Sequence, residues 1–150
     1  MLGLALAAEK DWPGAVAQFE RAYALGQDNA EYVLDLANAL VNAGVDIERA
    51  HRLAAAVQIK DSANPRAHDV AGWCLFRLGQ HQEAHQELEK ARALIEVKGT
   101  RQPSDASIYE HLAEVYTAFK DGMMAREMYA RAIESDPSRR EEWARRGQGA

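Results

Sequence analysis

The chain has 150 residues and a mass of 16.6 kDa, enough for one compact domain or a short array of repeats. Hydrophobic residues make up 47% and charged residues 27%, which excludes a disordered, collagen-like or disulfide-dominated chain. The formal charge of −5 argues against a general nucleic-acid surface, and no stretch reaches the roughly 20 apolar residues that a membrane helix requires.

Alanine is the compositional outlier, with 29 copies against 10 glycines and 4 prolines. Alanine has the highest helix propensity, whereas sheets favour β-branched residues, so the composition predicts an all-α chain. The single Cys74 excludes an intramolecular disulfide and leaves the compartment open, because a cytoplasmic and a periplasmic location both fit.

Small residues recur along the chain at matched intervals. Sets that start at Gly3, Gly72 and Ala113 each have further small residues after gaps of 12 and then 7 positions. A set that starts at Ala37 has a first gap of 13, which predicts one extra residue in the turn at 44–47. Starts separated by 34, 35 and 41 residues indicate a solenoid of helical repeats.

Each repeat is predicted to be a pair of antiparallel amphipathic helices. In chain order the units span residues 1–29, 30–65, 66–98 and 106–139. Residues 99–105, between the third and fourth units, are expected to form a mobile loop in which Ser104 or Asp105 caps the next helix. Residues 140–150 form a capping helix or the start of a fifth unit.

The repeats resemble the tetratricopeptide repeat, whose pattern combines an aromatic residue, Leu-Gly, Tyr, Ala-x3-Phe and a closing Pro. The fourth unit carries most of these elements: Tyr109, Leu112, Ala113, Tyr116, Ala125, Tyr129, Ala132 and Pro137. The resemblance covers essentially the whole chain and implies a right-handed α-solenoid of about four units plus a partial fifth.

The two ends of the chain interrupt the repeat pattern. The chain begins within a first helix and ends after Trp143 and Gly147, so we expect an excerpt of a longer array whose exposed ends self-associate. Residues 1–8 have the apolar character of a signal peptide, but no basic segment precedes them and Leu2, Gly3 and Leu6 fit the repeat core.

The sequence contains no convincing catalytic or cofactor motif. His81 and His85 have the i, i+4 spacing of zinc ligands, but Gln82 stands where a metalloprotease has Glu and no third ligand is evident. The two histidines are better explained as part of a solvated helix face. Cys74 lies among apolar residues, which indicates an inert packing thiol. We therefore expect no enzyme, metal or cofactor.

In tetratricopeptide repeat proteins the first helix of each pair lines a concave groove that holds peptide segments. The resemblance places the following residues on that wall: Leu34, Asp35, Asn38, Asn42, Arg66, Asp69, Trp73, Phe76, Arg77, Glu110, His111, Glu114 and Thr117. Trp73 and Phe76 are the candidate anchors, although their three-residue spacing fits core packing equally well. Asn38 and Asn42 can offer paired hydrogen bonds to a peptide backbone.

Acidic residues outnumber basic ones on this predicted wall, which favours a basic or amphipathic partner. The subclass that grips a C-terminal carboxylate uses Lys, Asn and Arg, of which only Asn38 is convincing here. The sequence thus predicts a non-catalytic scaffold that binds a protein or peptide, with no nucleic acid and no membrane insertion. The alternative is a regulatory or substrate-positioning part of a larger enzyme or of a bacterial envelope assembly or export machine.

Overall fold

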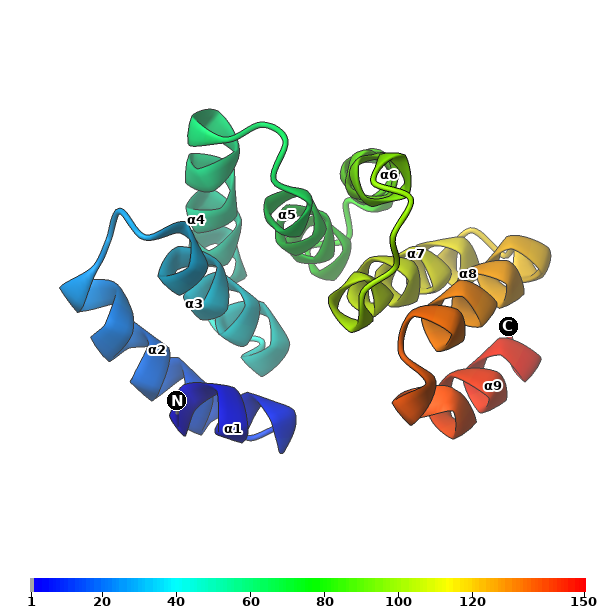
Figure 1. The fold of residues 1–150 in the computed structure, drawn as a ribbon, viewed down its shortest axis with the longest axis horizontal. Helices are drawn as coiled ribbons and strands as arrows, with labels where there is room; N and C mark the ends of the chain where they lie inside the picture. The colour runs from blue at the N-terminus through cyan, green and yellow to red at the C-terminus, as the bar shows by residue number, and fades with distance from the viewer. Residues whose placement is uncertain (1) are drawn as a thin grey trace.

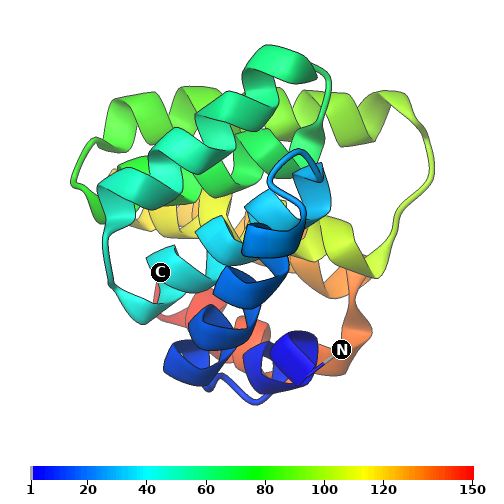
Figure 2. The same ribbon diagram turned by 90° about the vertical axis from the view of Figure 1, so that its left-hand side faces the viewer.

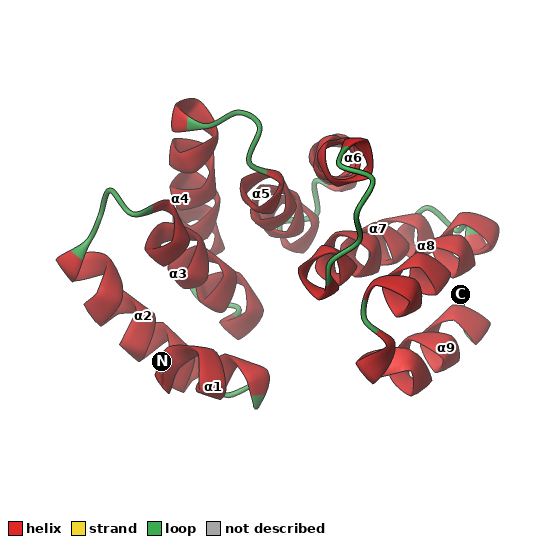
Figure 3. Cartoon of the chain, viewed as in Figure 1, coloured by secondary structure: helices red, strands yellow, loops and turns green. Residues whose placement is uncertain are grey.

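The computed structural model describes residues 2–150, which form nine α-helices and two short 3₁₀-helices with no strand in that range (Figure 3). The all-α architecture expected from the composition is confirmed. In chain order the elements are α1 (Leu2–Ala8), α2 (Trp12–Leu25), α3 (Ala30–Ala43), α4 (Ile47–Lys60), α5 (Pro65–Arg77), α6 (His81–Val97), η1 (Pro103–Asp105), α7 (Ala106–Ala118), α8 (Gly122–Ser135), η2 (Pro137–Arg139) and α9 (Arg140–Gln148).

The helices alternate between two layers of a curved array (Figure 1). The odd-numbered helices follow the inner side of the arc and the even-numbered helices follow its outer side. Helix α3 packs on α5 and α5 packs on α7, whereas successive outer helices make no comparable contact among the described residues. Because the inner helices approach one another while the outer ones spread apart, the stack curves around its first-helix side.

Small side chains occupy the crossings between paired helices. Ala15, Ala50, Ala84 and Ala125 are completely buried. A Cβ added at Gly72 would lie 2.7 Å from Leu88 Cγ, closer than van der Waals contact. The recurring small residues therefore set how closely the two helices of a pair can approach.

The turn after each inner helix contains a residue in the left-handed region. Lys10, Gly79 and Lys120 have φ values of 61°, 82° and 61°, and the next residue caps the following helix. In the second unit Gly44 has φ 72°, but Val45 then separates it from the cap residue. The extra residue predicted in the turn at 44–47 is confirmed.

Side chains cap most of the helices at their N-termini, as in α2, where Asp11 accepts a hydrogen bond from the Gly14 amide at 3.1 Å. The expected capping of α7 by Ser104 or Asp105 is wrong, because α7 has no side-chain cap. Asp105 instead accepts a hydrogen bond from the Gln102 amide at 2.9 Å. Its carboxylate therefore closes η1, the 3₁₀-turn that precedes the helix.

Helix α9 packs on α8 at the C-terminal end of the array. Trp143 is completely buried there, and Arg139 lies over its ring with the guanidinium carbon 4.4 Å from the ring centroid. Gly147, one turn further on, faces Tyr129 of α8. The last helix therefore covers the side of α8 that would otherwise be open to solvent.

Candidate functional site

A polar groove of about 340 Å³ lies on the concave side of the array. Its walls come from the α1–α2 turn, the start of α2, α3, α5, α7, η2 and α9. The lining residues are Lys10, Trp12, Asn38, Asn42, Trp73, Ser107, Glu110, His111, Glu114, Arg139, Glu142 and Arg146. Figures 1 and 2 both place α1 and α9 on the same side of the array, and Figure 1 shows them at the two ends of the arc.

Six of the ten residues proposed from the sequence meet in this groove, namely Asn38, Asn42, Trp73, Glu110, His111 and Glu114. The other four, Asp35, Asp69, Phe76 and Arg77, lie outside its lining. The first helices of three different units thus converge on one hollow, as the repeat register requires.

Two of the predicted acidic wall residues are buried in ion pairs. Asp35 accepts a hydrogen bond from Arg66 at 2.6 Å, and its side chain is only 11% exposed. Asp69 contacts His111 at 2.7 Å, and its side chain is 6% exposed. Leu34, also expected on the wall, is fully buried in the core. Helical spacing identified the correct side of the helix but placed these three residues too far from the core.

Trp73 belongs both to the groove wall and to an aromatic stack. Its ring is nearly parallel to that of His111 at a centroid distance of 4.2 Å and to that of Phe76 at 5.2 Å. Phe76 stacks in turn on His81 at 4.8 Å, so it packs between helices and does not line the groove. Arg77 is exposed, donates to the Val41 carbonyl at 3.2 Å and lies near the Trp73 ring. These contacts fix the orientation of the indole.

The two asparagines bind each other. Asn42 Nδ2 donates to the Asn38 carbonyl at 2.8 Å and to Asn38 Oδ1 at 3.1 Å, while Asn42 Oδ1 accepts from Trp73 Nε1 at 3.3 Å. Asn42 is therefore occupied inside the protein. Asn38 Nδ2 has no acceptor among the described residues and remains a donor at the groove.

Asp69 joins two groove residues of α7 to α5. Its Oδ1 lies 2.7 Å from His111 Nδ1, and its Oδ2 accepts from Ser107 Oγ at 2.6 Å. The Asp69 carboxylate thus lies between the hydroxyl and the imidazole, and Ser107 donates to the carboxylate and not to the imidazole. A serine–histidine pair requires the imidazole at the hydroxyl, so this arrangement positions His111 without forming such a pair.

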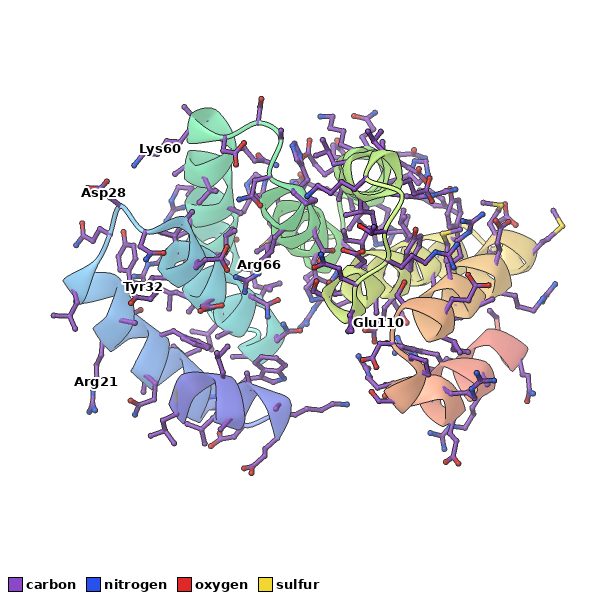
Figure 4. All side chains as sticks on the ribbon, in the orientation of Figure 1. Arg21, Asp28, Tyr32, Lys60, Arg66 and Glu110 are labelled. Atoms are coloured by element: carbon purple, nitrogen blue, oxygen red, sulfur yellow. The ribbon has the colours of Figure 1, made fainter. Side chains whose placement is uncertain are left out.

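Two arginines of the C-terminal wall were not among the residues predicted from the sequence. Arg139 donates to both oxygens of Glu110 at 3.0 and 3.1 Å, and Arg146 donates to Glu110 at 2.7 Å and also to Glu114. Figure 4 shows Glu110 on α7 near this end of the array. Arg139, Glu142 and Arg146 are spaced by three and four residues, which places them on one helix face. That spacing, which lies past the fourth unit, is the sequence signal that could have identified the wall.

The ion pairs with Arg139 and Arg146 lower the pKa values of two glutamates in this wall. Burial would raise the pKa of Glu110, but hydrogen bonds from Arg139 and Arg146 and the nearby His111 outweigh it, so the pKa lies below its ordinary value. The hydrogen bond from Arg139 likewise lowers the pKa of Glu142. Glu110 and Glu142 are therefore ionised and paired at neutral pH.

His81 and His85 contact different aromatic groups. His81 stacks on Phe76, whereas His85 Nε2 lies 3.0 Å from the Tyr116 hydroxyl and the ring meets Tyr116 edge-on. Both side chains are half-buried, so their interpretation as a solvated helix face is wrong. Within residues 2–150 no group of three or more His, Cys, Asp or Glu side chains has an arrangement suited to a metal ion.

Cys74 is completely buried, and burial raises the pKa of its thiol to about 12. The interpretation of Cys74 as a packing thiol is confirmed. None of the helices in the described part of the chain has the length and apolarity needed to cross a membrane.

Residues 67–138, which include most of α5 and all of α6, α7 and α8, match the family model for the tetratricopeptide repeat. This part of the chain, slightly less than half of its length, is similar to the tetratricopeptide repeat family. The match covers the third and fourth units. None of the curated proteins matches the chain.

Solved structures share the fold of the chain over nearly its whole length. MamA from Desulfovibrio magneticus RS-1 is 21% identical, with a TM-score of 0.62 over 91% of this chain and 72% of that one. PilF of Pseudomonas aeruginosa is 20% identical, with a TM-score of 0.66 over 91% of this chain and 59% of that one. A thermophilic repeat protein of Thermus thermophilus is 18% identical, with a TM-score of 0.56 over 99% of this chain and 94% of that one. The predicted α-solenoid is thereby confirmed.

Proposed function

We propose that this chain is a non-catalytic scaffold that binds a segment of a partner protein in its concave groove. The observation that carries the proposal is the convergence of side chains from both ends and from the middle of the array on one hollow of about 340 Å³. Peptide-recognition sites commonly combine such a preformed concave surface with a few placed polar groups and aromatic side chains.

The stacking and hydrogen bonding of Trp73 favour this function energetically. Its indole is fixed by His111, Phe76 and Asn42 before any partner arrives. A partner that contacts the indole therefore loses little conformational entropy on the side of the scaffold. The alternative role inside a larger enzyme or envelope machine stays a prediction, because it concerns parts outside these residues.

Site-specific photo-crosslinking tests whether the groove is the binding surface. A photoreactive amino acid replaces Asn38 in the groove or, as the matched control, Gln86 on the exposed face of outer helix α6. In a lysate of the cells that naturally contain the protein, we expect crosslinked protein adducts when the photoreactive group is at position 38. These adducts should be absent or weak when the group is at position 86. Adducts that form equally or preferentially from Gln86, or no adduct from Asn38, would overturn the groove as the binding site.

A further inference from the structure

A second hollow, of about 190 Å³, adjoins the concave groove, and we call it the side pocket. Its lining includes Val70 of α5, Ile95 of α6 and Ile108 of α7. Asn38 and Ser107 line both the side pocket and the groove. A segment that lies in the groove can therefore direct one of its side chains into the side pocket.

The side pocket lies at a unit boundary whose linker is longer than those before it. The linkers at 26–29 and 61–64 have four residues each, whereas the linker at 98–105 has eight. The last residues of this longer linker form η1, from which Ser104 and Asp105 contribute to the pocket wall. The additional residues, which do not belong to the repeat pattern, therefore complete the pocket.

The deeper part of the side pocket is apolar. Val70 and Ile108 are 3% exposed and Ile95 is 5% exposed, whereas Ser104 is exposed and lies at the mouth. Apolar side chains below a polar edge favour an apolar ligand group, because burial of apolar surface stabilises the complex and polar groups at the edge stay in contact with water.

The charged groups in the lining have hydrogen-bond partners inside the protein. Arg66 donates to Glu31 at 2.7 Å and to Asp35 at 2.6 Å. Asp69 is bound by two side chains of α7, and Asp105 accepts the backbone hydrogen bond that closes η1. A charged ligand side chain would therefore lose its hydration in the side pocket without gaining a new partner.

The volume of the side pocket is sufficient for one large aliphatic side chain. A cavity of about 150 Å³ lined by apolar residues holds a benzene molecule. The side pocket, at about 190 Å³, is larger than this. A leucine side chain has fewer carbon atoms than benzene and therefore fits within it.

We propose that the side pocket receives one large aliphatic side chain, of leucine size, from the protein segment that binds in the groove. This inference rests on the proposed function and names a sequence requirement of its ligand. Ligand specificity then depends on the longer linker, which completes the side pocket, in addition to the regular positions of the repeat.

A titration followed through isoleucine methyl signals tests the side pocket. The full chain is labelled with ¹³C in its isoleucine methyl groups, because Ile95 and Ile108 line the pocket and Ile59 is an exposed control on α4. The probes are peptides Gly-Ser-X-Ser-Gly with both ends blocked, in which X is Leu, Ala or Lys. We expect the Leu peptide to shift the signals of Ile95 and Ile108 but not that of Ile59. It should bind at least about tenfold more tightly than the other two peptides.

Ser104→Phe tests the assignment by placing an aromatic ring at the mouth of the side pocket. Ser104 is exposed, and its hydroxyl forms no hydrogen bond with the described residues, so the fold should tolerate the change. Ser138→Phe is the matched control, because Ser138 is also an exposed serine that follows the proline of a 3₁₀-helix. Ser104→Phe should weaken binding of the Leu peptide at least about tenfold, and Ser138→Phe should leave it unchanged. If Ser104→Phe does not fold, Ser104→Glu places a charge at the same mouth and should weaken binding as well.

Several results of the titration would contradict the assignment. Equal binding of the Leu and Ala peptides, preferential binding of the Lys peptide, or no saturable shift at Ile95 and Ile108 would overturn the side pocket as an aliphatic site. Equal shifts at Ile59, or undiminished binding of the Leu peptide to both variants at position 104, would do the same.

The crosslinking experiment separates this inference from the proposed function. With the photoreactive group at position 38, Ser104→Phe should reduce the protein adducts and Ser138→Phe should not. Adducts that persist undiminished in Ser104→Phe would support the groove but overturn the role of the side pocket in ligand binding. Binding of the Leu peptide without any adduct at position 38 would overturn the proposed function, and with it the assignment of the side pocket to a groove-bound segment.

Discussion

At the scale of single residues, the concave wall consists of side chains that bind one another across unit boundaries. Asp35 pairs with Arg66, and Asp69 pairs with His111, over 31 and 42 residues of sequence. Within the fourth unit, the Tyr129 hydroxyl donates to Glu114 at 2.6 Å. Each of these pairs joins neighbouring helices, so the polar residues that shape the groove also hold the array together.

Glu110→Gln should weaken the fold at neutral pH and reduce its sensitivity to acid. The folded-state pKa of Glu110 is depressed, so its stabilisation is complete above the ordinary carboxyl value of 4.5 and is lost as the pH falls below that value. Loss of the charged hydrogen bonds should lower the free energy of unfolding by about 1.5 to 3 kcal/mol at pH ~7. Urea unfolding between neutral pH and about pH 3 measures both effects.

Glu83→Gln is the matched control, because Glu83 is exposed and makes no ion pair among the described residues. Its unfolding free energy should follow that of the wild type at every pH. If Glu110→Gln loses stability with acid as steeply as the wild type does, the depressed pKa of Glu110 is not a source of the pH dependence.

Sequence patterns predict the face on which such residues lie but not their depth or their partners. The resemblance to the tetratricopeptide repeat placed Asn38, Trp73 and His111 on the wall, and all three line the groove. The helical period cannot show that Asp69 is buried beneath His111, because burial depends on the tilt and separation of α5 and α7. A buried carboxylate also needs a partner, and that partner lies in another unit.

At the scale of elements, the turn between the helices of a pair is the most regular feature of the array. The left-handed residue falls seven positions after the small residue that starts each set, at 10, 44, 79 and 120. Two of these positions hold glycine and two hold lysine. The spacing of small residues therefore predicted the turns, including the longer one, although it could not show that lysine adopts the left-handed conformation.

Lys120→Gly should stabilise the protein. The left-handed conformation costs a residue with a Cβ about 1 to 2 kcal/mol of folding free energy, which glycine avoids. The greater conformational entropy of glycine in the unfolded chain offsets part of this stabilisation. The net effect should raise Tm by about 2 to 4 °C in a chain of this size, as measured by thermal unfolding followed by circular dichroism. Lys120→Ala keeps the Cβ and should give no increase. An equal increase from alanine would mean that the lysine side chain, and not the backbone, is responsible.

At the scale of the whole molecule, the chain is a row of units that contact mainly their neighbours. Helix α9 packs on α8 and forms ion pairs with α7 through Arg146, while α3 lies two units away. The core is likewise divided into two clusters that meet within α5, between Cys74 and Leu75. Removal of contacts at one end of the array should therefore destabilise mainly the units at that end.

Removal of residues 140–150 should destabilise the fourth unit selectively. The deletion exposes the surface of α8 that Trp143 covers and leaves Glu110 without Arg146. Amide hydrogen exchange should accelerate at least about tenfold in α7 and α8 and remain near wild type in α3. An equal acceleration in α3 would show that the array unfolds as one cooperative unit.

The overall architecture could be predicted because one spacing repeats over the whole chain. The spacing of Arg139, Glu142 and Arg146 indicates one charged helix face, whereas the contacts that this face makes at the groove could not be predicted. The repeat pattern predicts a capping or fifth-unit helix at residues 140–150 but does not indicate what the charged face of that helix contacts. The curvature of the array brings Arg139 and Arg146 into contact with Glu110. This curvature accumulates over successive helix crossings, and no local sequence pattern records it.

The rims of the groove belong to opposite ends of the chain, with Lys10 and Trp12 on one side and Glu142 and Arg146 on the other. The width of the groove mouth thus depends on the small rotations between helices at every interface that separates the two rims. A substitution far from the mouth, at any crossing where alanine or glycine sets the helix spacing, would widen or narrow the opening without touching a single rim residue.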